Sequence, residues 1–320
     1  MIRCLAMLAC LLLYWSGPAW PQEYPARPLR MVLPFPAGGG SDLIARIIAQ
    51  KYSAQLGQQV VVDNRAGASG NIAADLVAKA PGDGYTVLFA NSSLSISPAI
   101  YKKLSYDPVR DLTAISMASS YPFVLVAHPA LPVKNVRELV ALAKSRPNLL
   151  DYSSAGTGTM SHMAMEMLRV KTGTRITHLP YKGAAPATVA LLTGESQAAF
   201  VVMPVAAPLI NTGRLRGLGV AAKTRSAVAP NVPTMEEAGV PDHLALQWNG
   251  LFVPSKTPQA VQDRLYREWV MAVKSPEVVQ RIRAEGAEPG GNSPAEFSAF
   301  YKAEAAKWAD VAKRSGTTVD

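Results

Sequence analysis

Two glycine-rich turns contain the residues best suited to bind a ligand. Glycine lets the main chain approach a ligand closely, and a helix that begins directly after such a turn points free N–H groups at an anion. The first turn runs through Phe35, Pro36, Ala37, Gly38, Gly39, Gly40, Ser41 and Asp42. The second runs through Ser154, Ala155, Gly156, Thr157, Gly158 and Thr159. The pattern predicts two anion-binding turns on one chain.

Neither turn matches a nucleotide-binding loop. The phosphate loop G-x-x-x-x-G-K-[ST] needs a lysine after its last glycine, and the dinucleotide fingerprint G-x-G-x-x-G needs glycines at fixed offsets. Neither pattern occurs here. A tight turn without a ligand remains the alternative for each segment taken alone. Two such turns on one chain favour a ligand with two anionic ends, or one anionic end held from two sides.

Two further groups of residues are candidates for ligand contact. Asn91 and Ser92 follow an apolar strand, at the end where open α/β sheets bind ligands; a polar turn that caps the next helix is the alternative. Tyr181, Lys182 and Gly183 follow a short strand. Lys182 either attracts the negative charge of a ligand or stays solvated, and Tyr181 serves either recognition or packing.

Three residues beside the glycine-rich turns have two interpretations each. His162, near the start of the helix after the second turn, is either a ligand contact or a structural histidine. Asp42 would repel an anion, so we expect Asp42 to cap a helix or order water rather than touch a carboxylate. Phe35 is either a wall of the pocket or part of the core.

The composition argues against several other functions. The net charge of +9 is spread along the chain without a block of like charges, which speaks against nucleic-acid binding. The four histidines lie at unrelated spacings, so we expect no metal and no cofactor. A secreted α/β enzyme is a remote alternative, because G-x-S-x-G, a Ser-His-Asp order and kinase or metal-hydrolase motifs are all missing.

Residues 1–19 have the features of a secretory signal peptide. Arg3 gives the n-region its positive charge, residues 5–14 form an apolar h-region, and residues 17–19 form a cleavage site of small residues. Cys4 and Cys10 both lie in this segment, so we expect a cysteine-free, periplasmic mature protein that starts near Trp20. A lipid anchor at Cys10 is the alternative.

Alternating strand and helix patterns predict an α/β fold. The first third follows β-α-β-α-β order, which is typical of a parallel sheet. The predicted strands are 29–33, 59–63, 85–90, 121–128, 177–181, 198–203, 215–221 and 246–253, and the predicted helices are 43–56, 71–80, 133–145, 161–172, 186–193, 235–238, 258–274 and 294–313. We expect the last two helices to cover the sheet of the N-terminal half.

The chain resembles the Bug (TctC-like) family, the extracytoplasmic solute-binding subunits of tripartite tricarboxylate transporters. The resemblance spans nearly the whole mature chain, and its specificity lies in the order and spacing of the motifs. They are residues 34–42, 64–70, 153–159 with His162 and Glu166, 180–183, and 232–239.

The resemblance implies a type II periplasmic-binding-protein fold: two α/β lobes, joined by two crossover strands, with the ligand at the hinge. We expect residues 25–125 and 248–320 in lobe 1 and residues 126–247 in lobe 2. The two turns would then hold a carboxylate largely through backbone amides and bridging water. The expected partners are the membrane permease subunits of such a transporter, with a ligand sensor for a membrane receptor as the alternative, and a monomer is expected.

One departure from the family pattern bears on the ligand. Members often carry a carboxylate or another polar group where this chain has Val201, Val202 and Met203, a position that would meet the ammonium of an amino acid. We expect a wall of Phe35, Val202 and Met203 without an acidic side chain. The expected ligand is therefore a dicarboxylate or an aromatic carboxylate rather than an amino acid. Ala37 replaces a proline common in the first turn, which we expect to alter stiffness rather than chemistry.

Overall fold

The computed structural model describes residues 24–38 and 40–319. The expected signal peptide with Cys4 and Cys10, and the turn residue Gly39, lie outside the described residues. No helix within 24–38 and 40–319 is long and apolar enough to cross a membrane.

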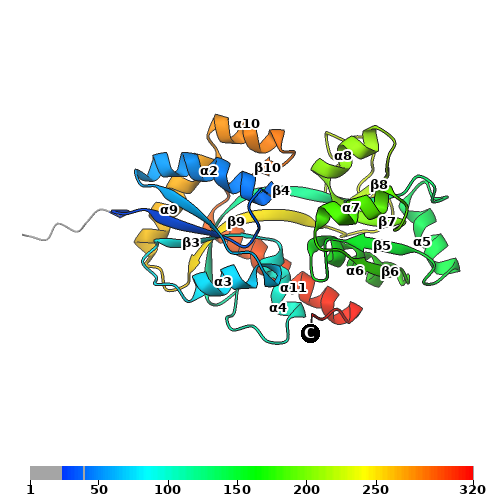
Figure 1. Ribbon diagram of the computed structural model, residues 1–320, viewed down its shortest axis with the longest axis horizontal. Coiled ribbons are helices and arrows are strands. Elements are labelled where there is room, and N and C mark those ends of the chain that lie inside the picture. Colours follow the sequence, from blue (N-terminus) through cyan, green and yellow to red (C-terminus); the bar gives the residue numbers. More distant parts are fainter. Residues whose placement is uncertain (1–23, 39, 320) are drawn as a thin grey trace, which may run out of the picture.

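Figure 1 shows two lobes connected by long strands. The strands lie in the order β2-β1-β3-β9-β4-β7-β5-β6, with β8 and β10 also paired to β4. The strands are β1 (Leu29–Leu33), β2 (Val60–Asn64), β3 (Thr86–Asn91), β4 (Leu112–Ala127), β5 (Asp151–Ser154), β6 (Thr177–Pro180), β7 (Ala198–Val202), β8 (Arg216–Val220), β9 (Leu246–Pro254) and β10 (Glu288–Pro289). The α/β class predicted from the sequence is confirmed.

Strands β4 and β9 run antiparallel to each other from one lobe into the other. In the first lobe β9 pairs with β3, whereas beyond Phe123 β4 pairs with β7 and β8. The sequence pattern located only the second half of β4, residues 121–128. The half that was missed, residues 112–120, contains several small and polar residues, and its pairing with β9 makes it a strand.

Helices cover both faces of the sheet in each lobe. They are α2 (Gly40–Leu56), α3 (Asn71–Ala78), α4 (Ser93–Ile100), α5 (Val136–Ser145), α6 (Met160–Thr172), α7 (Ala184–Leu192), α8 (Met203–Asn211), α9 (Gln259–Val273), α10 (Pro276–Ala284) and α11 (Pro294–Ser315), with a 3₁₀ turn η1 (Ala68–Gly70) before α3. In the first lobe, Trp269 of α9 packs edge-on against Tyr52 of α2. On the opposite face, Trp248 of β9 packs against Phe297 of α11. These aromatic contacts fasten the helices to the two faces of the sheet.

The structure corrects the expected placement of the last helix. Helix α11 begins at a capping box formed by Ser293 and Glu296, and its first half buries Phe297 in the core of the first lobe. Its second half buries Trp308 and Val311 in the core of the second lobe. The helix therefore braces both lobes instead of covering only the N-terminal sheet (Figure 1).

Three shorter elements also differ from the prediction. Residues 235–238 form a turn rather than a helix. Helices α8 and α10 were not predicted, because Pro204 and Pro208 lie within α8 and α10 is a short, mostly polar segment. Pro204 occupies the first turn of α8, where proline is tolerated because the N–H group there has no intrahelical acceptor.

Candidate ligand-binding site

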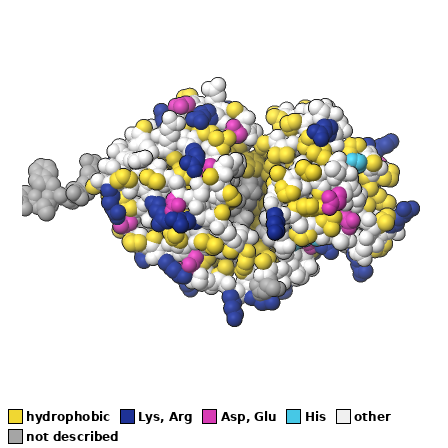
Figure 2. All heavy atoms as spheres, in the orientation of Figure 1, with side chains coloured by type: hydrophobic (Ala, Val, Ile, Leu, Met, Phe, Trp, Pro, Cys, Tyr) yellow, Lys and Arg dark blue, Asp and Glu magenta, His cyan; other side chains and the backbone are white. Residues whose placement is uncertain are grey.

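A cavity of about 460 Å³ lies between the two lobes. Pockets of this size are typical of small-molecule sites. The space-filling view shows the groove between the lobes with hydrophobic side chains along it (Figure 2). The lining residues are Gly40, Ser41, Ile44, Asn91, Ser93, Tyr121, Phe123, Ser153, Ser154, Ala155, Thr159, Met160, Ser161, Ala184, Ala187, Thr188, Ala199, Phe200, Val201, Val202, Pro204, Val205, Gln247 and Glu285.

The first-lobe side of the cavity is the start of helix α2. Gly40, Ser41 and Ile44 lie on the lining, and the N–H groups in the first turn of a helix have no intrahelical acceptors. Tyr121 of the connecting strand β4 also lines the cavity. Burial raises the pKa of Tyr121, and a hydrogen bond with Ser41 works in the opposite direction. Ser41 thus connects the start of α2 to the strand that joins the lobes.

Asp42 holds loop 1, which we define as residues 34–38 after β1. The Asp42 carboxylate accepts hydrogen bonds from Gly38 N–H, from Arg46 Nε and from Asn64 Nδ2, each at 2.9 Å. Burial alone would raise the pKa of Asp42, but these donors outweigh burial and lower it. Asp42 does not line the cavity, so its negative charge is neutralised behind the turn.

The end of β3 supplies a second polar edge. Asn91 Oδ1 accepts a hydrogen bond from Ser93 N–H at 3.0 Å, and both residues line the cavity. Ser92 is fully buried, and its hydroxyl lies 3.1 Å from Gln247 Oε1 on β9. Gln247 is itself part of the lining. Ser92 therefore positions Gln247 rather than facing the cavity.

The second-lobe side contains loop 2, which we define as residues 155–159 between β5 and α6. Three of its backbone donors are engaged within the protein by side chains: Ala155 N–H bonds to Ser161 Oγ, Gly156 N–H to Ser154 Oγ, and Gly158 N–H to His162 Nδ1, at 3.0–3.1 Å. Loop amides at these positions are therefore not free to bind a carboxylate.

Hydroxyl groups and the start of α6 face the cavity instead. Ser154, Thr159 and Ser161 all belong to the lining, together with Met160 at the first position of α6. Thr159 Oγ1 donates to Gly156 O at 2.7 Å and lies 3.0 Å from Ser161 Oγ. No side chain caps this helix start, which leaves its first-turn N–H groups for a ligand.

Two glycines of loop 2 have backbone conformations that other residues rarely adopt. Gly156 has φ +130°, and a Cβ atom there would lie 3.2 Å from Tyr181 O. Gly158 has φ +77°, and a Cβ atom there would collide with Ile100 of α4. Loop 2 is therefore packed between the following β6–α7 segment and a helix of the first lobe.

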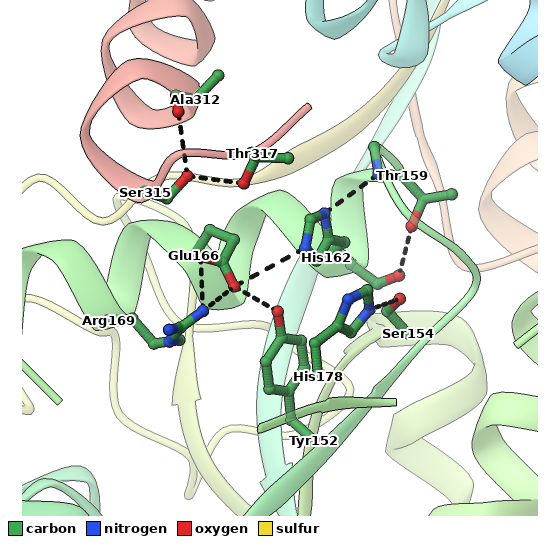
Figure 3. Close-up of polar contacts among 12 residues, drawn as sticks. Tyr152, Ser154, Thr159, His162, Glu166, Arg169, His178, Ala312, Ser315 and Thr317 are labelled. Atoms are coloured by element: carbon green, nitrogen blue, oxygen red, sulfur yellow. Dashed lines mark hydrogen bonds and ion pairs between the residues drawn. The ribbon is translucent and has the colours of Figure 1, made fainter. Parts of the chain in front are cut away.

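A buried polar cluster supports loop 2 from behind (Figure 3). The rings of His162 and His178 stack with centroids 4.1 Å apart, and Tyr152 stacks on His178 at 4.8 Å. Glu166 accepts hydrogen bonds from the Tyr152 hydroxyl and from Arg169, whose Nη1 lies 2.6 Å from Oε1. Burial lowers the pKa of both histidines to about 4, with Arg169 adding to the shift at His162 and the His162 charge to that at His178.

The remaining wall is apolar. Among the described residues that line the cavity, Glu285 is the only charged one, and its side chain is exposed, in the turn after α10. Val202 lines the cavity as expected, whereas Met203 is buried in the second-lobe core and Phe35 packs on the first-lobe core. The expected wall without an acidic side chain therefore needs two corrections: Phe35 and Met203 do not form it, and Glu285 does lie at its edge.

A family model described as "Tripartite tricarboxylate transporter family receptor" matches residues 44–317 of the chain. The chain belongs to this receptor family. It is 37% identical over 303 residues to protein BugT of Bordetella pertussis, which covers 94% of this chain and 93% of BugT. The resemblance stated from the motifs is confirmed.

Solved structures of similar proteins give the same fold. A protein of R. palustris solved with adipate is 35% identical and matches with a TM-score of 0.80, covering 92% of this chain and 99% of that one. MatC from Rhodopseudomonas palustris with bound malate is 30% identical, with a TM-score of 0.78 over 90% of this chain and 99% of MatC. The two-lobe binding-protein fold is thereby confirmed. The family and its solved members are receptors and binding proteins, so this receptor is not an enzyme.

Some of the sequence-predicted site residues of this TctC-family receptor lie together on the cavity, and others do not. Those on the lining are Gly40, Ser41, Asn91, Ser154, Ala155, Thr159 and Val202. Those outside it are Phe35, Pro36, Ala37, Gly38, Asp42, Ser92, Gly156, Thr157, Gly158, His162, Tyr181, Lys182, Gly183 and Met203. Tyr181 donates its hydroxyl to Glu195 at 2.7 Å, and Lys182 is exposed. Gly39 is not among the described residues.

Several lining residues of this receptor were missed by sequence reasoning. Tyr121, Phe123 and Gln247 come from the connecting strands β4 and β9, and Thr188 comes from α7. Ser161 is the first residue of the predicted helix 161–172 but was not selected as a site residue, although a serine at the start of a helix is a detectable signal. No sequence feature near Glu285 indicates that this residue lies on the cavity. Within residues 24–38 and 40–319, no group of histidine or acidic residues has the arrangement of a metal site.

Proposed function

We propose that this receptor captures a small carboxylate without an ammonium group in the periplasm and delivers it to the membrane subunits of a tripartite tricarboxylate transporter. The observation that carries the proposal is the lining of the cavity. Uncharged donors stand on both lobes, at the start of α2 on one side and at Ser154 with the start of α6 on the other, and an apolar wall lies beside them. Several hydroxyl and amide donors together bind a carboxylate without a cationic side chain.

The apolar wall favours a hydrocarbon or aromatic spacer. Phe123, Val202 and Val205 lie on the lining. Burying apolar ligand surface against them gains about 25 cal/mol per Å². An ammonium in the same place would lose its hydration without a buried carboxylate partner, because Glu285 is exposed at the edge. We therefore favour a dicarboxylate or an aromatic carboxylate over an amino acid.

The similar proteins support the same ligand class. One R. palustris relative is solved with adipate, and MatC is solved with malate. Both ligands carry two carboxylates and no ammonium. The binding contacts we propose for this chain are the start of α2 with Ser41, the edge at Asn91, the hydroxyls of Ser154 and Ser161, and the free N–H groups at the start of α6.

We further propose that the lobes close on the ligand, with residues 25–125 and 248–320 forming one lobe and residues 126–247 the other, and with the second half of α11 reaching from the first lobe onto the second. A ligand that touches both lobes stabilises the closed state through contacts that exist only when the lobes approach. Small-angle scattering should then give a smaller radius of gyration with saturating ligand than without it. Delivery to a membrane sensor instead of a permease is the second candidate, since a binding protein of this fold serves either.

A ligand panel tests the proposed ligand class. Thermal unfolding followed by calorimetric titration would use adipate, citrate, terephthalate and nicotinate, with succinate and aspartate, and glutarate and glutamate, as pairs that differ only in the amino group. Ligand at about 100 times its Kd should add roughly 2.7 kcal/mol to the unfolding free energy. We expect at least one acid without an amino group to bind, and glutarate to bind more tightly than glutamate. Glutamate or aspartate binding about tenfold more tightly than every other acid would overturn the proposal.

A further inference from the structure

Ser154 lines the cavity, and its hydroxyl oxygen has well-defined neighbours. Gly156 N–H donates to Ser154 Oγ at 3.1 Å, and His178 Nε2 lies 2.6 Å from the same oxygen. Gly156 O lies at 3.3 Å, which is a long contact for a hydroxyl donor. Ser154 is 1% exposed and belongs to the cavity lining. The direction in which the Ser154 hydroxyl proton points therefore depends on whether His178 Nε2 donates or accepts a hydrogen bond.

The His178 ring is fixed in place. Its strand β6 runs parallel to β5 with His178 opposite Tyr152. The ring lies between Tyr152, at 4.8 Å and 16°, and His162, at 4.1 Å and 21° (Figure 3). Stacking on both faces prevents the ring from turning away from Ser154. The charged groups nearest to it, Glu166 and Arg169 on α6, are paired with each other.

A neutral imidazole carries a single N–H, so its tautomer decides the hydrogen bond. Burial lowers the pKa of His178 to about 4, and the ring is therefore neutral at pH 7. The neighbouring ring has its proton on Nε2, because His162 Nδ1 accepts from Gly158 N–H. For His178 there are two arrangements: Nε2–H donates to Ser154, or Nε2 accepts the Ser154 proton.

We propose that His178 donates its Nε2–H to Ser154 Oγ and so directs the Ser154 hydroxyl proton into the cavity, where it binds the ligand carboxylate. With Gly156 and His178 as donors, both acceptor positions of the hydroxyl are filled, and only its proton is left to interact. The opposite arrangement would present a lone pair to a carboxylate that has no proton to give. His178 is thus a positioning residue that makes Ser154 selective for anions. The inference rests on the proposed carboxylate function.

Nitrogen-15 NMR of the histidine side chains tests the tautomer in the wild-type protein, with and without adipate. We expect His178 to carry its proton on Nε2 at pH 7 in both states. A proton on Nδ1 would overturn the inference. This measurement needs no variant and does not depend on binding.

Binding measurements test the role of the pair. We expect Ser154→Ala and His178→Phe each to weaken adipate binding about tenfold, as for a hydrogen bond to a charged group, and the double variant to be no weaker than either single variant. His178→Gln places an amide N–H near Nε2 and should retain binding better than His178→Phe. His128→Gln, at the end of β4 and outside the lining, is the matched control and should bind like the wild type.

The outcomes separate the two proposals. Additive losses in the double variant, or equal losses in His178→Gln and His178→Phe, would overturn the positioning role. If the wild type binds a panel acid but His178 is protonated on Nδ1, this inference fails while the proposed function stands. If the wild type binds none of the acids, both fail.

Discussion

Loop 1 leads into the start of α2, which lines the cavity, whereas loop 2 lines the cavity itself through Ala155 and Thr159, and the two loops are held in place in different ways. Loop 1 is exposed at Pro36, Ala37 and Gly38 and is tied down mainly by the Asp42 carboxylate. Loop 2 is half-buried, is bonded to the hydroxyls of Ser154 and Ser161 on either side of it, and rests on the stacked histidines. The comparison indicates that the second lobe offers a preformed half-site, whereas the first lobe supplies a half-site that adapts to the ligand.

Lowering the pH should change the unfolding free energy more than any of the substitutions below. It should also distinguish the histidines that support loop 2 from Asp42, which supports loop 1. Burial lowers the pKa of His162 and His178 to about 4, and that of His243 to about 3. Because these folded-state values lie below the ordinary value of 6.5, the unfolded chain binds more protons as the pH falls. The stabilisation is complete above about pH 6.5 and declines by about 1.4 kcal/mol per pH unit for each histidine until the folded pKa is reached.

The pKa of Asp42 is also lowered, from 3.8, so its contribution is lost only at more acidic pH. Urea unfolding at pH 7.5, 6.0 and 4.5 measures the histidine effect before Asp42 is protonated. We expect the unfolding free energy to fall steadily over this range. A flat profile between pH 6.5 and 4.5 would mean that the histidines are not held neutral behind loop 2.

Gly156→Val should be the most damaging single change at the site. Its φ of +130° disfavours any side chain, and the new Cβ would press on Tyr181 O. We expect adipate affinity to fall at least about tenfold, or 1.4 kcal/mol, in a calorimetric titration. Gly173→Ala, at the end of α6, has φ +68° and open space around it; this control should lose stability without losing affinity. Unchanged affinity in a folded Gly156→Val variant would contradict the preformed half-site.

Asp42→Ala should weaken stability more than binding. It removes the acceptor of Gly38 N–H and of Asn64 and leaves Arg46 without its ion-pair partner. We expect the unfolding free energy to fall by about 1–3 kcal/mol, with a change of less than about tenfold in affinity because the ligand orders loop 1 again. The control Asp63→Ala removes ion pairs with partly exposed Arg30 and Arg65 and should cost less than about 1 kcal/mol. Equal losses of unfolding free energy in Asp42→Ala and Asp63→Ala would show that Asp42 contributes no more to stability than a surface carboxylate.

Glu285→Gln should have the smallest effect, and its sign is informative. Glu285 is exposed at the edge of a cavity that we propose binds an anion. Its removal should strengthen adipate binding by a factor of about two to three at low salt, and by less at high salt, because exposed charges are screened. Weaker binding in this variant would indicate a ligand with a positive group.

The sequence was most informative where function depends on local structure. Glycines followed by helix starts pointed to Ser41, Ser154 and Thr159, which line the cavity, and the helix predicted over 133–145 is α5, whose N-cap is Asn135. The role expected for Asp42 as a capping residue is close to the observed one, since it bonds within the turn and stays off the lining.

Site residues that depend on pairing between distant strands could not be predicted from local sequence patterns. Tyr121 and Gln247 enter the cavity because β4 and β9 cross between the lobes, and they pair directly with each other in register. Met203 lies at the first position of α8, so its side chain leaves the alternation of β7 and enters the core. The engagement of loop 2 amides by hydroxyls also could not be predicted, because Ser, Thr and backbone groups have several partners within reach.

A crystal structure of the complex with the tightest-binding acid of the panel tests the shared role of the two lobes most directly. We expect a carboxylate within hydrogen-bonding distance of Ser154, Thr159 or Ser161, a second contact from the first turn of α2, and a larger movement of loop 1 than of loop 2. An acid that contacts only one lobe, or that lies at the Glu285 edge without touching either helix start, would contradict this.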